Sequence, residues 1–268
     1  MKDSLENILL KSHSDNGILR LTLNDPNNKN ALSESMMQEL LKAISNASED
    51  NSVKVIVIAS TGDVFCSGHN LKEINEAKKA DDNGESYYSG LFKTCSSLMQ
   101  LIINCSKPVI AEVNGIATAA GCRLVASCDL AVSSDSSKFA TPGVNIGLFC
   151  STPMVAVSRK INRKIMMKML LTGEPIRANY AKDIGLINDC FSKVKLNNEV
   201  LKMAKKIASK SNLTIKIGKQ SFYKQLEMPL RDAYNFTSKI MTLNMMSYDA
   251  KEGISAFFEK RKPKWKNK

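Results

Sequence analysis

Two short segments of the chain each follow an apolar stretch and then open into small residues. The first, residues 65–73, contains Gly68 and follows a predicted strand at 53–60; the second, residues 113–124, contains Gly121 and follows a predicted strand at 108–113. Small residues let another molecule approach the backbone, and the first N–H groups of a helix have no intrahelical acceptor. Two such N–H groups could bind one carbonyl oxygen as it gains negative charge. The segments could therefore form an oxyanion hole, although on these two segments alone plain backbone geometry at strand exits is the favoured explanation of both glycines.

A wider set of motifs, read in order, resembles the crotonase (enoyl-CoA hydratase/isomerase) superfamily. The motifs lie at residues 24–32, 65–73, 113–124, 139–147, 171–176, 181–188 and 252–261. They agree with the family in order and spacing from about residue 8 to the C-terminus. Within the superfamily the chain looks closest to the branch called enoyl-CoA hydratase domain-containing protein 3.

The resemblance assigns roles to single residues. In the family, the carbonyl oxygen of a coenzyme A (CoA) thioester lies between two backbone N–H groups, which map here to His69 and Ala120. Ala120 stands where the family usually has glycine, a change that backbone donation tolerates. The expected CoA-binding residues are Ala31, Gly68, Asn70, Leu71, Lys72, Gly121, Phe257 and Lys260, and the C-terminal ones often act on a neighbouring subunit. Lys264 is a further candidate for a CoA phosphate.

The chain departs from the family where water is activated. Hydratases of the family use two glutamates, and the matching positions hold Arg123 and Gly143. Hydration needs one group to accept a proton from water and another to give a proton to the α-carbon. A permanently protonated guanidinium and a glycine can do neither. The sequence therefore argues against hydration by the two-glutamate route, and Asn145 is left as a speculative orienting group.

Other polar residues near these motifs have ordinary explanations as well as catalytic ones. The ring of His69 could titrate near pH ~6.5, but its mapped role uses the backbone N–H. Cys150 would need a base partner to act as a nucleophile, so a buried structural thiol is favoured. Glu73 and Glu76 could reach the cleft or simply lie on a helix surface. Arg123 could pair with Asp129 or with a carboxylate of the substrate.

Composition limits the classes of protein to which the chain can belong. Its 268 residues suit one large domain or one domain with a small appendage. The formal net charge is +12, from 38 Lys and Arg against 26 Asp and Glu. Solvated surface lysines explain this charge, and a sharper alternative is attraction of the CoA phosphates. Nucleic acid is the weakest alternative, because no aromatic-basic platform accompanies the charge.

Further features bear on compartment and cofactors. No apolar run approaches a membrane span, and residues 1–7 lack the pattern of a secretory signal or transit peptide. The expected location is the bacterial cytoplasm, or the mitochondrial matrix for a trimmed form. The seven cysteines are scattered, which predicts reduced thiols and no metal site. No prosthetic group is expected, and the CoA thioester is the expected ligand.

The predicted elements specify an α/β fold. Strands at 17–23, 53–60, 108–113 and 130–133 alternate with helices at 33–48, 85–104 and 119–127, the first of them capped by Ser33. Helices follow at 153–160, 163–171, 177–184, 198–210, 214–227, 230–246 and 248–260. The resemblance refines this pattern to the ClpP/crotonase-like spiral of ββα units in residues 1–200. It also implies that residues 201–268 form a helical region for CoA contacts and for assembly into a trimer or a dimer of trimers.

Three functions remain open from the sequence. The first is an enzyme of fatty-acid and acyl-CoA metabolism, a lyase or isomerase that resembles enoyl-CoA hydratases and isomerases and stabilises an enolate or thioester adduct. The second is a hydrolase or a decarboxylase of acyl-CoA that uses the same oxyanion hole. The third is an acyl-CoA-binding or regulatory subunit without turnover, which Arg123 and Gly143 favour.

Overall fold

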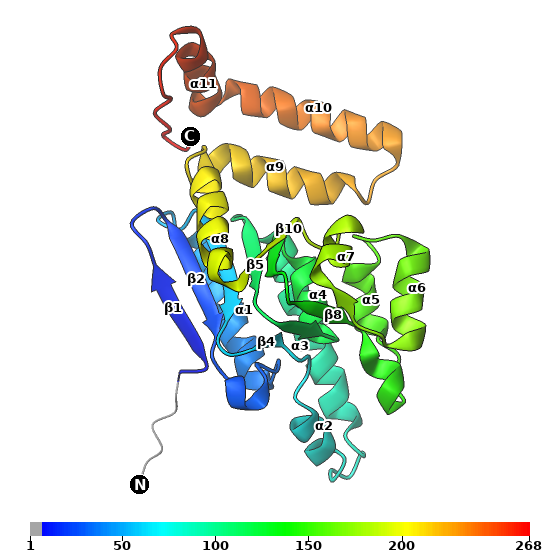
Figure 1. The fold of residues 1–268 in the computed structure, drawn as a ribbon. Helices are drawn as coiled ribbons and strands as arrows, with labels where there is room; N and C mark the ends of the chain where they lie inside the picture. The colour runs from blue at the N-terminus through cyan, green and yellow to red at the C-terminus, as the bar shows by residue number, and fades with distance from the viewer. Residues whose placement is uncertain (1–6) are drawn as a thin grey trace.

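The structure is a computed structural model that describes residues 7–268. The interpretation of residues 1–7 as neither signal nor transit peptide falls outside this described part, except for its last residue. The fold is the predicted α/β spiral of ββα units, with further helices at the C-terminal end (Figure 1). No helix within residues 7–268 is both long and apolar enough to span a membrane.

A six-stranded sheet in the order β1-β2-β3-β5-β7-β10 forms the centre of the molecule. Its strands are β1 (Leu9–His13), β2 (Ile18–Leu23), β3 (Val55–Ser60), β5 (Val109–Val113), β7 (Leu130–Ser134) and β10 (Asp189–Phe191). β1 pairs with β2 in antiparallel fashion, and the other neighbours are parallel. β3 and β5 are mostly apolar and buried along nearly their whole length, as is typical of parallel strands covered by helices on both faces; the one charged residue, Glu112 of β5, pairs with Arg20.

A second sheet contains the short strands that follow β3, β5 and β7. Its order is β4-β6-β8-β9, with β4 (Val64–Cys66), β6 (Ile116–Thr118), β8 (Lys138–Ala140) and β9 (Ile176–Arg177). The turns that lead into it are tight. At Gly115 φ is +89°, and a Cβ would lie 1.9 Å from the carbonyl oxygen of Asp63. Only glycine fits there, and this turn places the start of β6 beside β4.

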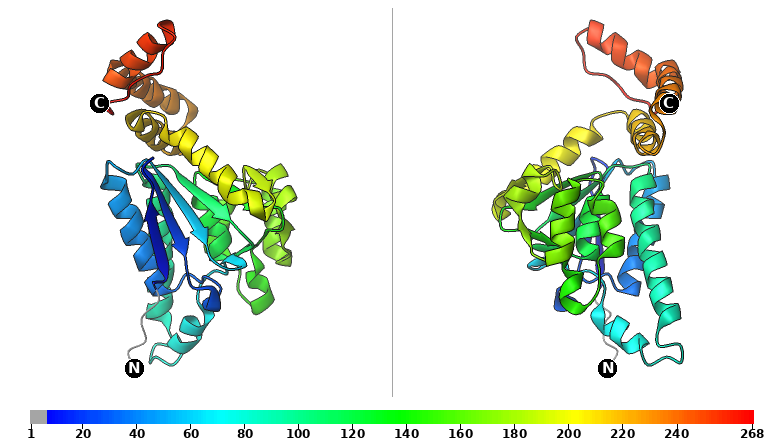
Figure 2. Two further views of the ribbon diagram at one scale, coloured as in Figure 1. Left: turned by 60° about the vertical axis from the view of Figure 1, so that its left-hand side comes forward. Right: turned by 90° about the vertical axis from the view of Figure 1, so that its right-hand side faces the viewer.

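Helices cover both faces of the large sheet (Figure 2). α1 (Glu34–Glu49), α3 (Glu85–Asn104) and α4 (Ala120–Ser127) contribute to the main core, and α8 (Lys193–Ala208) packs on the opposite face through Val200 and Ala204. The Ser33 hydroxyl accepts the N–H of Met36 at 3.2 Å, which confirms the predicted cap of α1. The remaining elements of this part are η1 (Pro26–Asn28), α2 (Leu71–Ala77), η2 (Pro142–Ile146), α5 (Ser151–Val157), α6 (Arg163–Thr172) and α7 (Ala178–Asp183).

Three C-terminal helices extend from one end of this core: α9 (Asn212–Gln225), α10 (Leu230–Met246) and α11 (Tyr248–Phe258) (Figures 1 and 2). They leave large apolar side chains exposed, including Leu230 at 75% and Phe257 at 80%. The predicted boundary between residues 200 and 201 falls inside α8, whose apolar face stays on the sheet as far as Ala208. The division into two regions stays a prediction.

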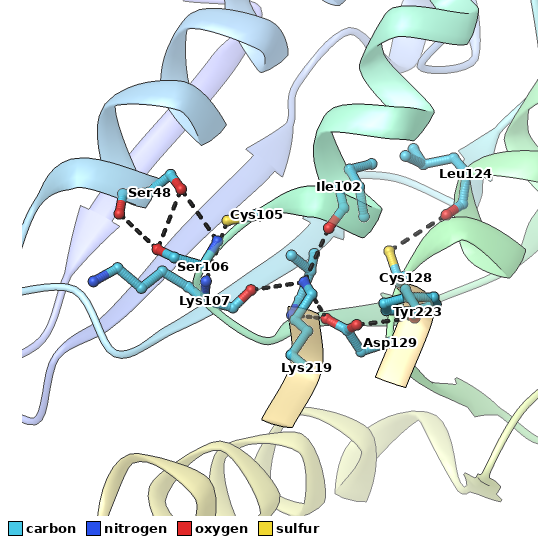
Figure 3. Close-up of polar contacts among 11 residues, drawn as sticks. Ser48, Ile102, Cys105, Ser106, Lys107, Leu124, Cys128, Asp129, Lys219 and Tyr223 are labelled. Carbon is cyan, nitrogen blue, oxygen red and sulfur yellow. Dashed lines mark hydrogen bonds and ion pairs between the residues drawn. The ribbon is translucent and has the colours of Figure 1, made fainter. Parts of the chain in front are cut away.

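One buried ion pair fixes α9 to the core (Figure 3). The Lys219 ammonium donates to the carbonyl oxygens of Ile102 and Lys107, each at 2.9 Å, and to Asp129 Oδ2 at 2.7 Å. The Tyr223 hydroxyl donates to the other oxygen of Asp129 at 3.0 Å. All three N–H bonds of the ammonium are therefore used, as a buried lysine requires.

Candidate active site

The two glycine-containing segments meet at the ends of β4 and β6. These strands are parallel neighbours, and the Thr118 hydroxyl donates to the carbonyl oxygen of Ser67 at 2.9 Å. Gly68 has φ +97°, and a Cβ there would lie 3.0 Å from the Ala119 methyl and 3.3 Å from the backbone nitrogen of Ala120. The sheet therefore brings the turn before His69 against the start of α4.

The backbone N–H groups of His69 and Ala120 make no hydrogen bond within residues 7–268. The carbonyl oxygen of Gly68 accepts the N–H of Leu32 at 2.7 Å, which holds the turn that carries the His69 amide. Ala120 is the first residue of α4, where an N–H has no intrahelical acceptor. Two free amides on adjoining segments are what an oxyanion hole requires.

Ala119 orients the second of these amides at a cost in backbone strain. Its backbone has φ 49° and ψ −118°, a conformation that favours glycine. Such strain costs about 1–3 kcal/mol, and it occurs mainly at functional sites. Because ψ of Ala119 sets the plane of the peptide that carries the Ala120 N–H, the strained residue fixes the direction of that donor. Sequence reasoning missed Ala119, although an alanine beside a family glycine was a signal.

Gly121 has a packing role. A Cβ at this position would lie 2.1 Å from the carbonyl oxygen of Cys66. No other residue type fits without moving α4 away from β4. The close contact therefore keeps the first turn of the helix, and with it the Ala120 amide, next to the Gly68 turn.

The turn at Asn30 holds the start of β4 and so supports residues 65–73. Asn30 has φ 51° and is fully buried, and its amide nitrogen donates to the carbonyl oxygens of Thr61 at 2.9 Å and Val64 at 2.7 Å. Its amide oxygen accepts the N–H of Asp25 at 2.8 Å. Ala31, expected near the CoA adenine, is buried beside it at 4% exposure. The motif at residues 24–32 thus ties η1 to the turns on either side of β4.

The expected CoA residues after His69 lie together at the start of α2. Asn70 caps this helix by accepting the N–H of Lys72 at 3.0 Å, and it donates to Glu73 at 3.1 Å. The Lys72 ammonium reaches Asn28 at 3.3 Å, and Leu71 is 55% exposed. An exposed apolar side chain and a basic one therefore border the free amide of His69.

The position of the first missing glutamate holds a buried cation. Arg123 is 6% exposed; its Nη2 donates to Ser96 Oγ at 3.0 Å, and its Nη1 lies 3.6 Å from Cys95 Sγ. Burial lowers the pKa of His69; the backbone of Leu32 opposes this, and the charge of Arg123 adds a smaller lowering. The His69 ring packs edge-on against Phe92 with centroids 5.7 Å apart. It is therefore a neutral packing group at neutral pH, and sequence reasoning missed its contact with α3.

The position of the second missing glutamate has no space for a side chain. A Cβ on Gly143 would lie 2.6 Å from the carbonyl oxygen of Leu148 and 2.9 Å from Cys150 Sγ. The N–H of Gly143 donates to the same sulfur at 3.3 Å. Burial raises the pKa of the Cys150 thiol, so it is protonated at neutral pH and acts as a packing and acceptor group. Asn145 is exposed, with its amide beside Gly173 at the end of α6.

Comparison with known proteins shows the family to which the chain belongs. The model of the enoyl-CoA hydratase/isomerase family matches residues 13–268. The chain belongs to this family, the crotonase superfamily. It is 48% identical over 257 residues to enoyl-CoA hydratase domain-containing protein 3, mitochondrial, of Mus musculus, covering 96% of this chain and 84% of the relative.

Solved structures agree with this assignment. The crystal structure of human enoyl coenzyme A hydratase domain-containing protein 3 is 46% identical with a TM-score of 0.91, covering 96% of this chain and all 100% of that one. The crystal structure of an enoyl-CoA hydratase from Mycobacterium smegmatis is 45% identical with a TM-score of 0.93, over 97% and 99% of the two chains. The predicted crotonase fold and its branch are confirmed.

The structure of this crotonase tests two expectations, the pairing of Arg123 with Asp129 and the position of Glu73 and Glu76. The pairing of Arg123 with Asp129 is wrong, because Asp129 binds Lys219 and Tyr223 instead (Figure 3). Glu73 accepts hydrogen bonds from Asn70 and from the Tyr87 hydroxyl, the latter at 3.2 Å, whereas Glu76 pairs with Lys79 on the surface. Within residues 7–268, neither glutamate forms a hydrogen bond or ion pair with Arg123.

The C-terminal CoA candidates are not next to the amides within one chain. Phe257, Lys260 and Lys264 lie on or after α11, at the opposite end of the molecule from α2 (Figure 1). Phe257 and its neighbour Phe258 are 80% and 76% exposed. Within one chain these side chains therefore cannot reach a ligand held beside Lys72.

Proposed function

We propose that this crotonase binds acyl-CoA thioesters and polarises the thioester carbonyl between the amides of His69 and Ala120. The observation that carries the proposal is the contact of Gly68 with the backbone of Ala120, which brings two amides without acceptors to adjoining segments. Donors fixed in advance at a developing oxyanion are usually the largest single contribution to such catalysis. The reaction class is therefore one that passes through an enolate or a tetrahedral adduct of an acyl-CoA.

The two-glutamate hydration route is excluded from this proposal on chemical grounds. Arg123 stays protonated, and Gly143 cannot be replaced by a longer residue without a collision. No described carboxylate takes over the two positions, since Glu73 and Asp129 are engaged elsewhere. Isomerisation, thioester hydrolysis and decarboxylation all use the same oxyanion hole and need a different proton donor. They remain the enzymatic alternatives.

Thermal unfolding in the presence of matched ligands tests the proposed site. An acyl-CoA should raise the melting temperature, whereas the corresponding free acid should not. Gly68→Ala should abolish this protection, because its methyl group would lie 3.0 Å from the Ala119 methyl at a φ of +97°. Gly218→Ala is the matched control, since a Cβ there meets nothing within 4 Å. Protection that survives in Gly68→Ala, or that the free acid also gives, would remove the proposal.

A binding or regulatory subunit without turnover is the second candidate. The observation that favours it is the loss of both acid–base positions, Arg123 and Gly143, in a chain that retains the oxyanion geometry. A panel of acyl-CoA thioesters analysed by mass spectrometry separates the two. Any product of hydration, isomerisation, hydrolysis or decarboxylation above the protein-free rate supports an enzyme, and protection without any product supports the binding role.

Assembly into a trimer or a dimer of trimers would complete the CoA site. Exposed apolar side chains on α10 and α11 include Met241 at 58%, Leu243 at 67% and Met246 at 67%. Such a surface is typical of a subunit interface. In such an assembly, Phe257 and Lys260 of one subunit would contact the CoA bound to another. We also propose the mitochondrial matrix as the location, in line with the names of the relatives. Light scattering that gives a monomer would contradict the assembly.

A further inference from the structure

The guanidinium of Arg123 is a buried charge without a counter-ion. It is 6% exposed, and its two recorded partners, Ser96 and Cys95, are a hydroxyl and a thiol. Its Nε is buried and has no hydrogen-bond partner within residues 7–268. No carboxylate of the described residues forms an ion pair with it. Buried charges in proteins are normally paired, because an unpaired one is costly.

The neighbouring groups add no negative charge. Burial raises the pKa of the Cys95 thiol more than Arg123 lowers it, so the thiol stays protonated. Both ring nitrogens of His69 are buried and without hydrogen-bond partners, and the ring is neutral because burial and Arg123 lower its pKa. The region therefore carries one net positive charge, together with unsatisfied polar atoms from two residues.

This charge lies close to the proposed oxyanion hole. Arg123 follows Ala120 by three residues in α4, which is about one helical turn of ~5 Å. His69 supplies the other amide of the hole with its backbone, and its ring is near enough to Arg123 for the charge to affect its titration. The guanidinium and the proposed hole therefore share α4 and both neighbour His69.

We propose that Arg123 recognises a second carboxylate on the acyl chain, so that the preferred ligands are CoA thioesters of short dicarboxylic acids. This inference rests on the proposed function, because it assumes that the thioester carbonyl lies at His69 and Ala120. A guanidinium has five N–H donors, and the two contacts to Cys95 and Ser96 leave Nε and one bond on each terminal nitrogen. A guanidinium with unused N–H bonds can bind a carboxylate through charge-assisted hydrogen bonds.

The test compares two thioesters of equal chain length, succinyl-CoA and butyryl-CoA, by isothermal titration calorimetry. Wild-type protein should bind succinyl-CoA about 10- to 100-fold more tightly, the range for charge-assisted hydrogen bonds. Arg123→Gln should lose this preference and still bind butyryl-CoA with nearly unchanged affinity. Arg163→Gln, which removes an exposed arginine of α6, is the control for net charge and should keep the preference.

The outcomes separate this inference from the proposed function. Equal affinity for both thioesters in wild-type protein, or tighter binding of butyryl-CoA, overturns the role of Arg123 and leaves the thioester site standing. A preference that persists in Arg123→Gln also overturns it. Failure of wild-type protein to bind either thioester overturns both proposals. If Arg123→Gln does not fold, Arg123→Met, which is uncharged and similar in length, replaces it in the same comparison, and a preference that persists in it overturns the role of Arg123.

Discussion

The strain at Ala119 predicts opposite effects for two neighbouring substitutions. Ala119 has φ 49° and ψ −118°, whereas Ala120, already in the helix, has no positive φ. Changing either residue to glycine removes one methyl group, worth about 0.8 kcal/mol when fully buried. Either change also adds backbone freedom to the unfolded chain, which costs about 0.5–1 kcal/mol. The backbone contribution is shared by both variants, whereas the methyl contribution is smaller at the half-buried Ala119 than at the buried Ala120.

Only Ala119→Gly also relieves strain, by about 1–3 kcal/mol. The free energy of unfolding should therefore be higher in Ala119→Gly than in Ala120→Gly by about this amount. Ala120→Gly itself should be less stable than wild-type protein. The assay is urea denaturation at one protein concentration, because assembly makes stability depend on concentration.

Equal stability of the two glycine variants would refute the reasoning about strain. It would mean that the backbone at residue 119 is not held in a conformation that costs free energy. A functional companion measurement is binding of an acyl-CoA. Ala119→Gly should bind it more weakly even though it is the more stable variant, because a glycine fixes the direction of the Ala120 amide less firmly.

Three further predictions follow from contacts near the site. Gly143→Ala should lower the free energy of unfolding by about 1–3 kcal/mol, measured in urea, because the methyl collides with Leu148 and Cys150. For the same reason, the double variant Arg123→Glu/Gly143→Glu should still not hydrate crotonyl-CoA in a spectrophotometric assay. Turnover near that of a two-glutamate hydratase would contradict the packing argument. Lys219→Met should cost about 3 kcal/mol in the same urea assay, since it leaves the carboxylate of Asp129, 16% exposed, without its cation. The additional change Asp129→Asn should recover part of the loss, and an additive double variant would speak against the pair. Burial lowers the pKa of His69 in the folded protein, whereas an unfolded imidazole binds its proton near pH ~6.5. The free energy of unfolding of wild-type protein should therefore fall as the pH drops through that value. Urea denaturation at pH values on either side of it should show a smaller fall in His69→Gln.

Much of the fold was predictable because long elements carry a clear pattern. The buried run of β3 and the capped, amphipathic α1 appear within two residues of their expected bounds. The strands β4, β6, β8 and β9 were not predicted as elements, since two or three residues are too few for periodicity to show. β1 was missed because four of its five residues are exposed and its stretch reads as polar.

The candidate site was predictable only in part, for a related reason. The glycines and small residues marked the two segments, and the resemblance assigned the amides of His69 and Ala120. The strain at Ala119 is a backbone conformation that residue type does not reveal, and the contact of Arg123 with Cys95 and Ser96 joins residues 28 and 27 positions apart. Asp129 was misassigned because its partner Lys219 lies 90 residues away, in a helix whose position the sequence does not specify.

The central claim is that two amides polarise one thioester oxygen, and vibrational spectroscopy measures this directly. An acyl-CoA labelled with ¹³C at the thioester carbonyl allows its stretching band to be isolated in an infrared difference spectrum. On binding to wild-type protein the band should move to lower frequency, because both donors draw electron density onto the oxygen. A bound ligand whose carbonyl band stays where it is in water would contradict the account.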